Sequence, residues 1–194
     1  MEGDHAQIFD SVYTNKVWGI GSGTGSTEQG TRAYRWFLQH FLRSNQVRSV
    51  VDLGCGDWQI ARHMDWSGID YVGIDVSNVI LTTTRQHARP GVSFRQMDAT
   101  REELPKADLL IVKDVLQHWS NTDILGFLPK LKSYKRALVI NGFPPNAMNL
   151  LNVNIRTSGK YRPVNLKLPP FEVPGTDVFW FVSGEPKRVF LWQA

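Results

Sequence analysis

The sequence predicts an α/β fold with a doubly wound, mostly parallel seven-stranded sheet and helices on both faces. Short apolar runs alternate with helix-like segments between residues 47 and 141. The run Leu109–Val112 is apolar at every position, which is typical of a strand that is buried on both faces. Near the end of the chain, residues 178–183 and 188–192 flank the turn residues Gly184–Lys187, which predicts an antiparallel C-terminal hairpin.

The N-terminal region is expected to precede the sheet. Residues 1–13 resemble a short lead-in, and residues 14–31 are glycine-rich and therefore form a loop. Ser26 and Gln29 have the spacing of a capping box for the helix that follows. The apolar positions of that amphipathic helix recur with helical spacing at Tyr34, Phe37, Leu38, Phe41 and Leu42.

The remaining elements follow in a regular order. Strands are expected at residues 47–52, 71–74, 92–95, 107–112 and 137–141, and helices at 57–64, 77–88 and after Ser120, which can cap its helix together with Asp123. Right-handed crossovers between parallel strands then give the doubly wound arrangement. Residues 142–175 contain six of the ten prolines and no helical period, so we expect a proline-rich insertion in place of a helix.

Length and composition limit the class of protein. Residues 1–194 are enough for a single domain. No apolar run approaches the length of a membrane span, and a lone cysteine, Cys55, favours a reducing, cytoplasmic setting. The net charge of +4 comes from scattered basic residues, which indicates a solvated surface more than a nucleic-acid groove. We expect no metal site.

The most informative motif is Asp52-Leu53-Gly54-Cys55-Gly56, at the end of an apolar run. Its two glycines allow a ligand to approach the backbone closely. A dinucleotide fingerprint needs a third glycine, but that position is Gln59. Asp52 and Asp57 suit a cation better than a phosphate. A nucleoside with a sulfonium, S-adenosylmethionine, therefore fits this turn better than NAD or ATP.

The order of these motifs resembles that of class I S-adenosylmethionine-dependent methyltransferases. The resemblance covers residues 47–141 by motif, and the C-terminal hairpin by architecture. It implies that Asp75 binds the ribose hydroxyls, that Asp98 and Ala99 lie beside the adenine, and that Lys113 and Asp114 line the reaction centre. The expected cofactor-binding residues are Trp18, Gly23, Asp52, Gly54, Cys55, Gly56, Asp75, Val76, Asp98, Ala99 and Lys113.

The candidate catalytic residues follow the fourth strand. His118 is the best candidate for a general base, and Asp114 is a substitute; a packed histidine and a helix-capping aspartate are the structural alternatives. Methyl transfer depends mainly on positioning and water exclusion, so a base is needed only where the acceptor must lose a proton. The loop with Trp18 and Gly23 is expected to form a lid, with a flexible surface loop as the alternative.

The acceptor is expected to lie beside the insertion, where the candidate substrate-binding residues are Trp119, Arg156, Tyr161 and Arg162. An arginine there suits a carboxylate or a phosphate. The sequence therefore predicts methyl transfer to an oxygen or nitrogen of a small polar molecule, with S-adenosylhomocysteine as the second product.

Other functions stay open at this point. They are methylation of a protein side chain or of RNA, a non-catalytic cofactor-binding subunit that activates a partner, and an NAD-dependent enzyme. The strand-four exit reads Lys113-Asp114-Val115-Leu116. It lacks the Asn-Pro-Pro-Tyr-like motif of enzymes that methylate base nitrogens, which weighs against that reaction. The oligomeric state is not predicted.

Overall fold

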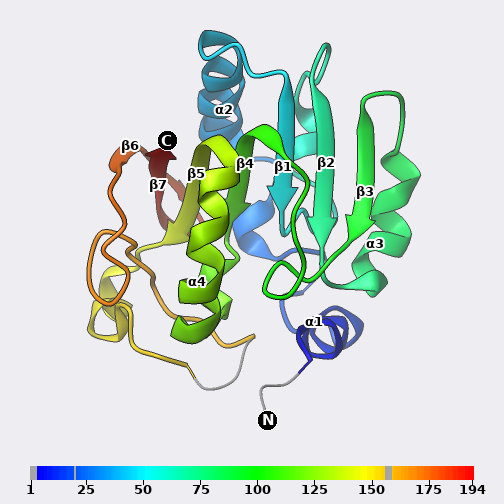
Figure 1. Ribbon diagram of the computed structural model, residues 1–194. Coiled ribbons are helices and arrows are strands. Elements are labelled where there is room, and N and C mark those ends of the chain that lie inside the picture. Colours follow the sequence, from blue (N-terminus) through cyan, green and yellow to red (C-terminus); the bar gives the residue numbers. More distant parts are fainter. Residues whose placement is uncertain (1–3, 20, 156–158) are drawn as a thin grey trace.

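The computed structural model describes residues 4–19, 21–155 and 159–194, and contains a seven-stranded sheet of order β3-β2-β1-β4-β5-β7-β6 (Figure 1). Strands β1 to β5 pair in parallel, whereas β7 is antiparallel to both β5 and β6. The predicted mostly parallel sheet with a C-terminal hairpin is therefore confirmed. The strands are β1 Ser49–Leu53, β2 Asp70–Asp75, β3 Val92–Gln96, β4 Ala107–Lys113, β5 Tyr134–Gly142, β6 Thr176–Ser183 and β7 Glu185–Gln193.

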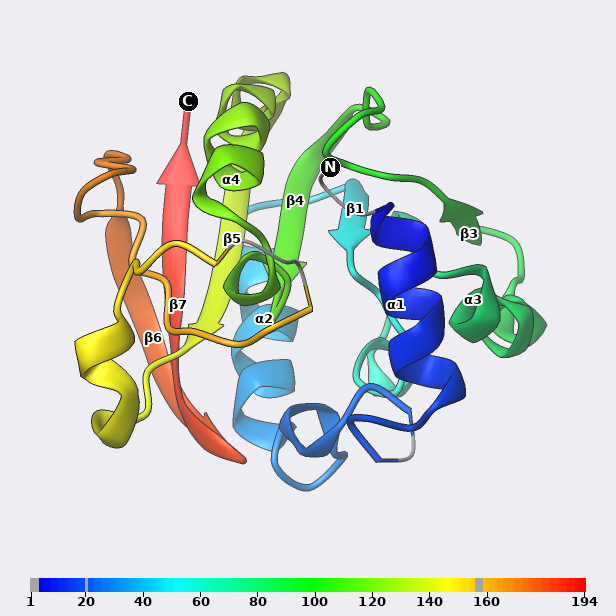
Figure 2. The ribbon, with the colours of Figure 1, turned by 90° about the horizontal axis from the view of Figure 1, so that it is seen from below.

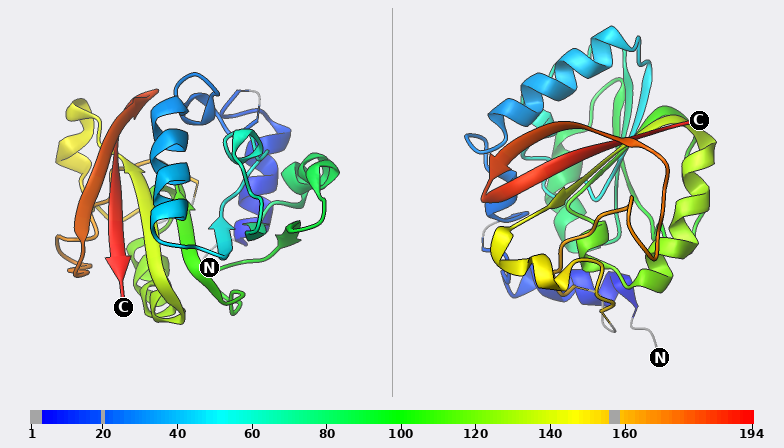
Figure 3. Two further views of the ribbon diagram at one scale, coloured as in Figure 1. Left: turned by 90° about the horizontal axis from the view of Figure 1, so that it is seen from above. Right: turned by 90° about the vertical axis from the view of Figure 1, so that its left-hand side faces the viewer.

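Helices cover both faces of the sheet, as Figure 3 shows for α2 and α4. The apolar side of α2 packs with Val50, Leu109 and Leu138 on one face of the sheet. Ile124 and Phe127 of α4 pack on the other face. The α-helices are α1 His5–Thr14, α2 Arg32–Ser44, α3 Asn78–Thr84 and α4 Asn121–Phe127. Short 3-10 helices span Thr24–Ser26, Ala61–His63, Arg85–His87, Leu116–His118, Leu128–Ser133 and Pro145–Leu150.

The N-terminal segment differs most from the sequence prediction. Residues expected to be a lead-in form α1, and the side chain of Asp4 caps this helix by accepting from the Ala6 N–H at 3.1 Å. Helix α1 lies across the edge of the sheet toward which β1 and β2 point (Figures 1 and 2). We call this side, where the parallel strands end, the carboxyl edge. Ligands of open α/β sheets bind at such an edge.

Two helix predictions were wrong in detail. The expected helix 57–64 is reduced to the 3-10 turn Ala61–His63, because Trp58 has a φ of 59° and is fully buried. A left-handed residue cannot continue an α-helix. The capping box was also wrong: Ser26 ends a 3-10 turn, and Thr31 precedes α2 without a side-chain cap. By contrast, the Ser120 hydroxyl accepts from the Asp123 N–H at 3.1 Å, as predicted.

The proline-rich segment between β5 and β6 folds back along the residues that follow β4. The Gly159 N–H donates to the His118 carbonyl at 2.9 Å, and the Arg162 N–H donates to the Gln117 carbonyl at 3.2 Å. Its regular structure, within the described residues, is the 3-10 helix Pro145–Leu150. The insertion therefore reaches the carboxyl edge. In the described part of the chain, none of the helices could cross a membrane.

Candidate active site

A cavity of about 440 Å³ opens at the carboxyl edge of the sheet. Its floor is built by residues that follow β1, β2, β3 and β4, its roof by α1 and the glycine-rich loop, and one wall by the β6–β7 hairpin. Of the predicted residues, the lining includes Trp18, Gly23, Gly54, Asp75, Val76, Asp98, Ala99, Lys113, Asp114, His118, Trp119 and Tyr161. The fold thus brings together most of the residues that the sequence singled out.

The glycine turn forms the centre of the floor. Gly54 has a φ of 75°, and a Cβ at this position would collide with Cγ2 of Val115. The N–H groups of Gly54 and Cys55 both donate to the Ile74 carbonyl, at 2.7 and 3.0 Å, so the turn is tied to the end of β2. Only glycine provides both this backbone conformation and this closeness.

Asp75 lies beside this turn and faces the cavity. Its two carboxylate oxygens accept from the Gly56 N–H at 3.0 Å and from the Ser77 N–H at 2.9 Å. Burial raises the pKa of Asp75 to about 6, although these backbone donors partly offset the rise. Each oxygen keeps a second lone pair, so the carboxylate can accept two more hydrogen bonds, as a ribose diol would donate.

Asp52, Cys55 and Gly56 were expected to bind the cofactor, but they do not line this cavity. The Asp52 carboxylate accepts from the Tyr71 hydroxyl at 2.5 Å, and borders a separate space of about 50 Å³ beneath the turn. Burial raises the pKa of Asp52 to about 6. A Cβ on Gly73 would lie 3.0 Å from the Cys55 sulfur, which therefore faces β2. These residues shape the turn, and the side chains of Asp52 and Cys55 lie outside the main cavity.

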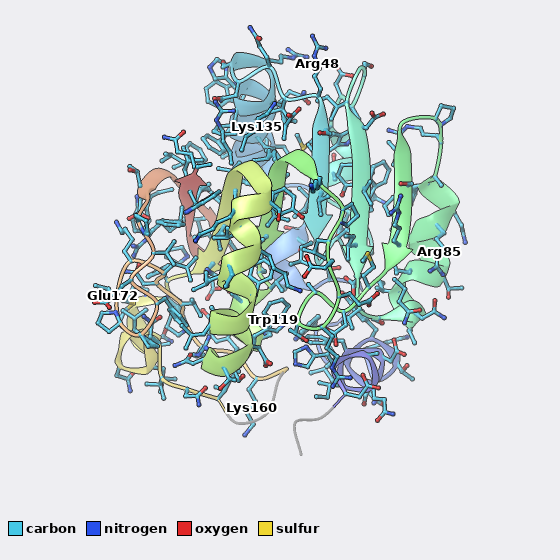
Figure 4. The ribbon with its side chains drawn as sticks, in the orientation of Figure 1. Arg48, Arg85, Trp119, Lys135, Lys160 and Glu172 are labelled. Atoms are coloured by element: carbon cyan, nitrogen blue, oxygen red, sulfur yellow. The ribbon has the colours of Figure 1, made fainter. Side chains whose placement is uncertain are left out.

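Asp98 and Ala99, which were expected beside the adenine, line the part of the cavity that follows β3. Asp98 accepts from the Thr100 N–H at 2.9 Å, and its other oxygen faces Arg101 at 3.6 Å. The ring of His5 lies 3.9 Å from Asp98 and 6.0 Å, between centroids, from Trp119. Trp119 was expected beside the acceptor. The structure instead places it toward the Asp98 end, on the side of α4 that faces α1 (Figure 4).

The opposite end holds a network of buried charges after β4. Asp114, with a φ of 59°, accepts from Lys113 on one carboxylate oxygen and from Lys187 at 2.7 Å on the other. Burial alone would raise the pKa of Asp114, but the two lysines outweigh it and lower the pKa to about 2. Lys113 also donates to the Gly25 carbonyl at 3.1 Å. Asp114 is thus a fixed carboxylate and a poor proton acceptor.

His118 is buried above this network and stays neutral at pH 7, because burial lowers its pKa. Its Nδ1 lies 3.1 Å from the Lys160 carbonyl, which can only accept, so Nδ1 carries the proton. Nε2 is then the acceptor nitrogen, with the Gln117 amide nitrogen 3.4 Å away. The neutral imidazole has the protonation state of a general base, and to act as one its Nε2 would exchange the Gln117 amide for the proton of an acceptor.

The insertion supplies one of the three acceptor residues expected from it. Tyr161 lines the cavity, whereas Arg156 lies outside the described residues. Arg162 was wrongly expected to bind an acceptor. The residue is 1% exposed, and its guanidinium donates to the carbonyls of Val153 at 2.7 Å and Trp119 at 2.8 Å. This arginine therefore joins the insertion to the strand-four exit and is unavailable to a ligand.

Sequence reasoning missed lining residues mainly in the roof and the hairpin wall, and it also missed Leu53, Met97, Val115 and Gln117 in the floor. The missed residues are His5, Phe9, Tyr13, Ser22, Thr24, Gly25, Ser26, Leu53, Met97, Val115, Gln117, Ser183, Gly184, Glu185 and Lys187. The hairpin turn was predicted, but no local signal shows that a turn distant in sequence contacts the glycine-rich loop. Here the Ser183 hydroxyl donates to the Gly25 carbonyl at 3.0 Å.

The glycine-rich loop is fastened to the turn after β1 by a reciprocal pair. The Ser22 hydroxyl donates to Asp57 Oδ1 at 3.0 Å, and the same hydroxyl accepts from the Asp57 N–H at 3.1 Å. Helix α1 is fastened separately, because Asp10 accepts from the Ser77 hydroxyl at 2.6 Å and from the Val79 N–H at 3.2 Å. The roof is therefore attached at both sides of the cavity.

Together, the sheet order, the glycine turn and the strand-end acids define a class of α/β proteins that bind a nucleoside at the carboxyl edge. Residues 50–137 match the model of the methyltransferase domain family. This part of the chain is therefore similar to a methyltransferase domain, and the chain has the class I fold of S-adenosylmethionine-dependent methyltransferases. The residues at this site fit S-adenosylmethionine. Each Asp75 oxygen can accept one more hydrogen bond, and the turn at Gly54 has no space for a Cβ.

Solved structures with the same fold are similar over nearly the whole chain. Magnesium protoporphyrin IX methyltransferase from Synechocystis with bound S-adenosylhomocysteine has a TM-score of 0.67 and 15% identity, and the match covers 96% of each chain. Human N-acetylserotonin methyltransferase in complex with S-adenosylmethionine has a TM-score of 0.60 and 18% identity. That match covers 96% of this chain and 59% of the human one.

One curated relative is similar in sequence over part of the chain. The human eEF1A lysine and N-terminal methyltransferase is 27% identical over 100 residues, which cover 45% of this chain. The chain spans 14% of the length of that relative.

Proposed function

We propose that the protein transfers a methyl group to an oxygen or nitrogen of a small polar acceptor bound between His118, Tyr161 and the β6–β7 hairpin. The observation that supports this most directly is the layout of the cavity. Asp98 and Asp75 line one end, and His118, Tyr161 and Glu185 line the other. A volume of about 440 Å³ is at the small end of ligand pockets, so little space remains beside a bound methyl donor.

In this proposal the residues of the chain act mainly by holding the methyl donor and the acceptor in position. Asp75 accepts from the ribose hydroxyls, and the Gly54 turn and Lys113 hold the methionine part. The bound S-adenosylmethionine supplies an electrophilic methyl group on sulfur. The roof formed by Phe9, Tyr13 and Trp18 excludes water, which strengthens the electrostatic interactions inside the site. The acceptor then meets the methyl group in one fixed orientation.

His118 completes the proposed machinery as a general base. Its neutral imidazole takes the proton of an acceptor that must lose one, through Nε2. Asp114 has a different role: its charge fixes Lys113 and Lys187, and so holds the strand-four exit against the hairpin. The substitution His118→Gln removes the proposed base and leaves a side chain of similar size.

A comparison of His118→Gln with the wild type tests this function. We expect S-adenosylhomocysteine to bind both proteins with affinities within threefold, and the rate of its formation with a methyl acceptor to fall by about 10² in the variant. Purified protein, labelled S-adenosylmethionine and metabolite fractions provide the assay. Binding of S-adenosylhomocysteine without turnover on any metabolite, protein or RNA fraction would instead favour a non-catalytic activator subunit.

Methylation of a protein side chain is the second candidate. The human relative named as a lysine and N-terminal methyltransferase supports it over the 45% of the chain that is similar. A single extended side chain also fits a small remaining space. Labelled methyl groups on protein after incubation with a protein fraction, and none on metabolites, would select this candidate.

A further inference from the structure

We propose that the acceptor is a primary amine, recognised by the Glu185 carboxylate together with the Tyr161 ring. This inference rests on the proposed function and narrows its acceptor class. The shared chemistry is an amino group on a short alkyl arm, whether that arm belongs to a free small molecule or to a lysine side chain.

Glu185 is the first residue of β7, and its carboxylate lies at the mouth of the cavity. One oxygen accepts from the Tyr161 hydroxyl at 2.8 Å, and the other from the Lys187 ammonium at 3.3 Å. The side chain is 23% exposed, so it faces the opening and is not sealed in the core. Each oxygen retains an acceptor site, which an N–H donor of a ligand can fill.

The end of β5 holds this carboxylate and Tyr161 in place. A Cβ added to Gly142 would collide with Oε1 of Glu185 and lie 2.7 Å from the Tyr161 hydroxyl oxygen. The Gly142 N–H donates to the Gln117 side-chain oxygen at 3.1 Å, so this strand end is itself fixed. The two side chains therefore rest directly on the backbone, where any larger residue would displace them.

Aromatic rings extend from this point into the cavity. The centroids of His118 and Tyr161 are 6.3 Å apart, and those of His118 and Trp18 are 5.1 Å apart. The faces of such rings attract an alkylammonium group. The same rings exclude water near the reaction centre, which favours the neutral amine over the ammonium form.

The charge pattern disfavours an anionic acceptor. Among the described residues that line the cavity, the lysine and arginine side chains are those of Lys113 and Lys187, and both contact Asp114. The guanidinium of Arg162 donates to backbone carbonyls elsewhere. A carboxylate or phosphate would thus have to displace Asp114 from its ammonium partners, whereas an amine can donate to the acceptor sites that Glu185 keeps beside its bonds to Tyr161 and Lys187.

The chemical step balances with groups already present. The ammonium first loses a proton to solvent, and the nitrogen lone pair forms a bond to the methyl carbon. The carbon–sulfur bond breaks and its electron pair remains on sulfur, which neutralises the sulfonium. The secondary ammonium then loses a proton to Nε2 of His118, which passes it to solvent.

A panel of acceptors tests the amine class. Primary alkylamines are each matched with the alcohol and the carboxylic acid of the same carbon skeleton, and S-adenosylhomocysteine formation is measured by mass spectrometry. We expect at least one amine to react ten or more times faster than its matched alcohol and acid. A lysine-containing peptide forms a second arm, which separates a protein side chain from a free amine as the source.

Two variants test the residues. Glu185→Gln keeps the size but removes the charge, and Gly142→Ala displaces the carboxylate; we expect each to lower amine turnover at least tenfold. The saturation-transfer NMR signal of an amine bound to S-adenosylhomocysteine-loaded protein should weaken in both variants, together with the turnover. Affinity for S-adenosylhomocysteine should stay within twofold, and the exposed control Glu103→Gln should match the wild type.

Either of two results would overturn the amine assignment while leaving the methyltransferase site intact. The first is that no amine reacts, or that alcohols or acids react faster. The second is that Glu185→Gln keeps the wild-type rate. If S-adenosylhomocysteine itself fails to bind to the wild type, the proposed function fails as well, so the two failures are distinguishable.

Discussion

The pH dependence of nucleoside binding should report the ionisation of Asp75. Burial raises the pKa of this residue to about 6, and only the carboxylate can accept from both ribose hydroxyls. Affinity for the nucleoside is therefore nearly full at pH 7 and above, and it falls as the carboxyl group is protonated through pH 6. At pH 5 about one molecule in eleven is ionised, so affinity for S-adenosylhomocysteine drops about tenfold from pH 7, or about 1.4 kcal/mol.

The stability of the ligand-free protein should change in the opposite direction. Because the folded state raises the pKa of Asp75 above its ordinary value of 3.8, folding favours the protonated form. The contribution of this group to stability is therefore fully present below about pH 4, and it is lost as the pH rises through 6. Melting temperatures at pH 4.5 to 7.5, with and without S-adenosylhomocysteine, separate the two effects.

Titration calorimetry between pH 5 and 7.5 provides the direct assay. Asp75→Asn should bind more weakly at pH 7 and lose the dependence on pH. Asp52→Asn is the matched control, since the pKa of Asp52 is also raised to about 6 by burial but its side chain is outside the main cavity. A flat profile in the wild type, or an unchanged slope in Asp75→Asn, would refute the role of Asp75.

Three further substitutions test separate features. Arg162→Ala should lower the free energy of unfolding by about 3 kcal/mol in chemical denaturation, because buried carbonyls lose their donors; an unchanged stability would contradict this role. Gly54→Ala should abolish nucleoside binding in calorimetry, since the added Cβ collides with Val115. Binding at wild-type affinity would contradict the proposed role of the glycine turn in holding the ligand. Ser22→Ala breaks the pairing with Asp57 and should speed S-adenosylhomocysteine release severalfold in stopped-flow measurements, whereas an unchanged rate would argue against a lid.

The sheet and the floor of the site could be predicted because their signals are local. The glycine turn at residue 54 follows an apolar strand, and Asp75 follows the next one. Parallel strands end at one edge, so residues at successive strand ends must come together. The fold then places Asp75, Asp98 and Asp114 around one cavity without any further information.

The roof and the hairpin wall could not be predicted because their positions depend on contacts between distant segments. Nothing near Ser183 indicates that it reaches Gly25, and nothing near Tyr161 indicates a bond to Glu185. Arg162 illustrates a related error. An arginine in a polar insertion resembles an anion ligand in sequence, but folding gives its donors to backbone carbonyls.

A crystal structure with bound S-adenosylhomocysteine would test the central claim most directly. The account predicts that both ribose hydroxyls donate to the Asp75 carboxylate, that the adenine lies beside Ala99, and that the sulfur faces the space between His118 and Glu185. A ligand bound elsewhere, or a ribose that does not contact Asp75, would contradict it.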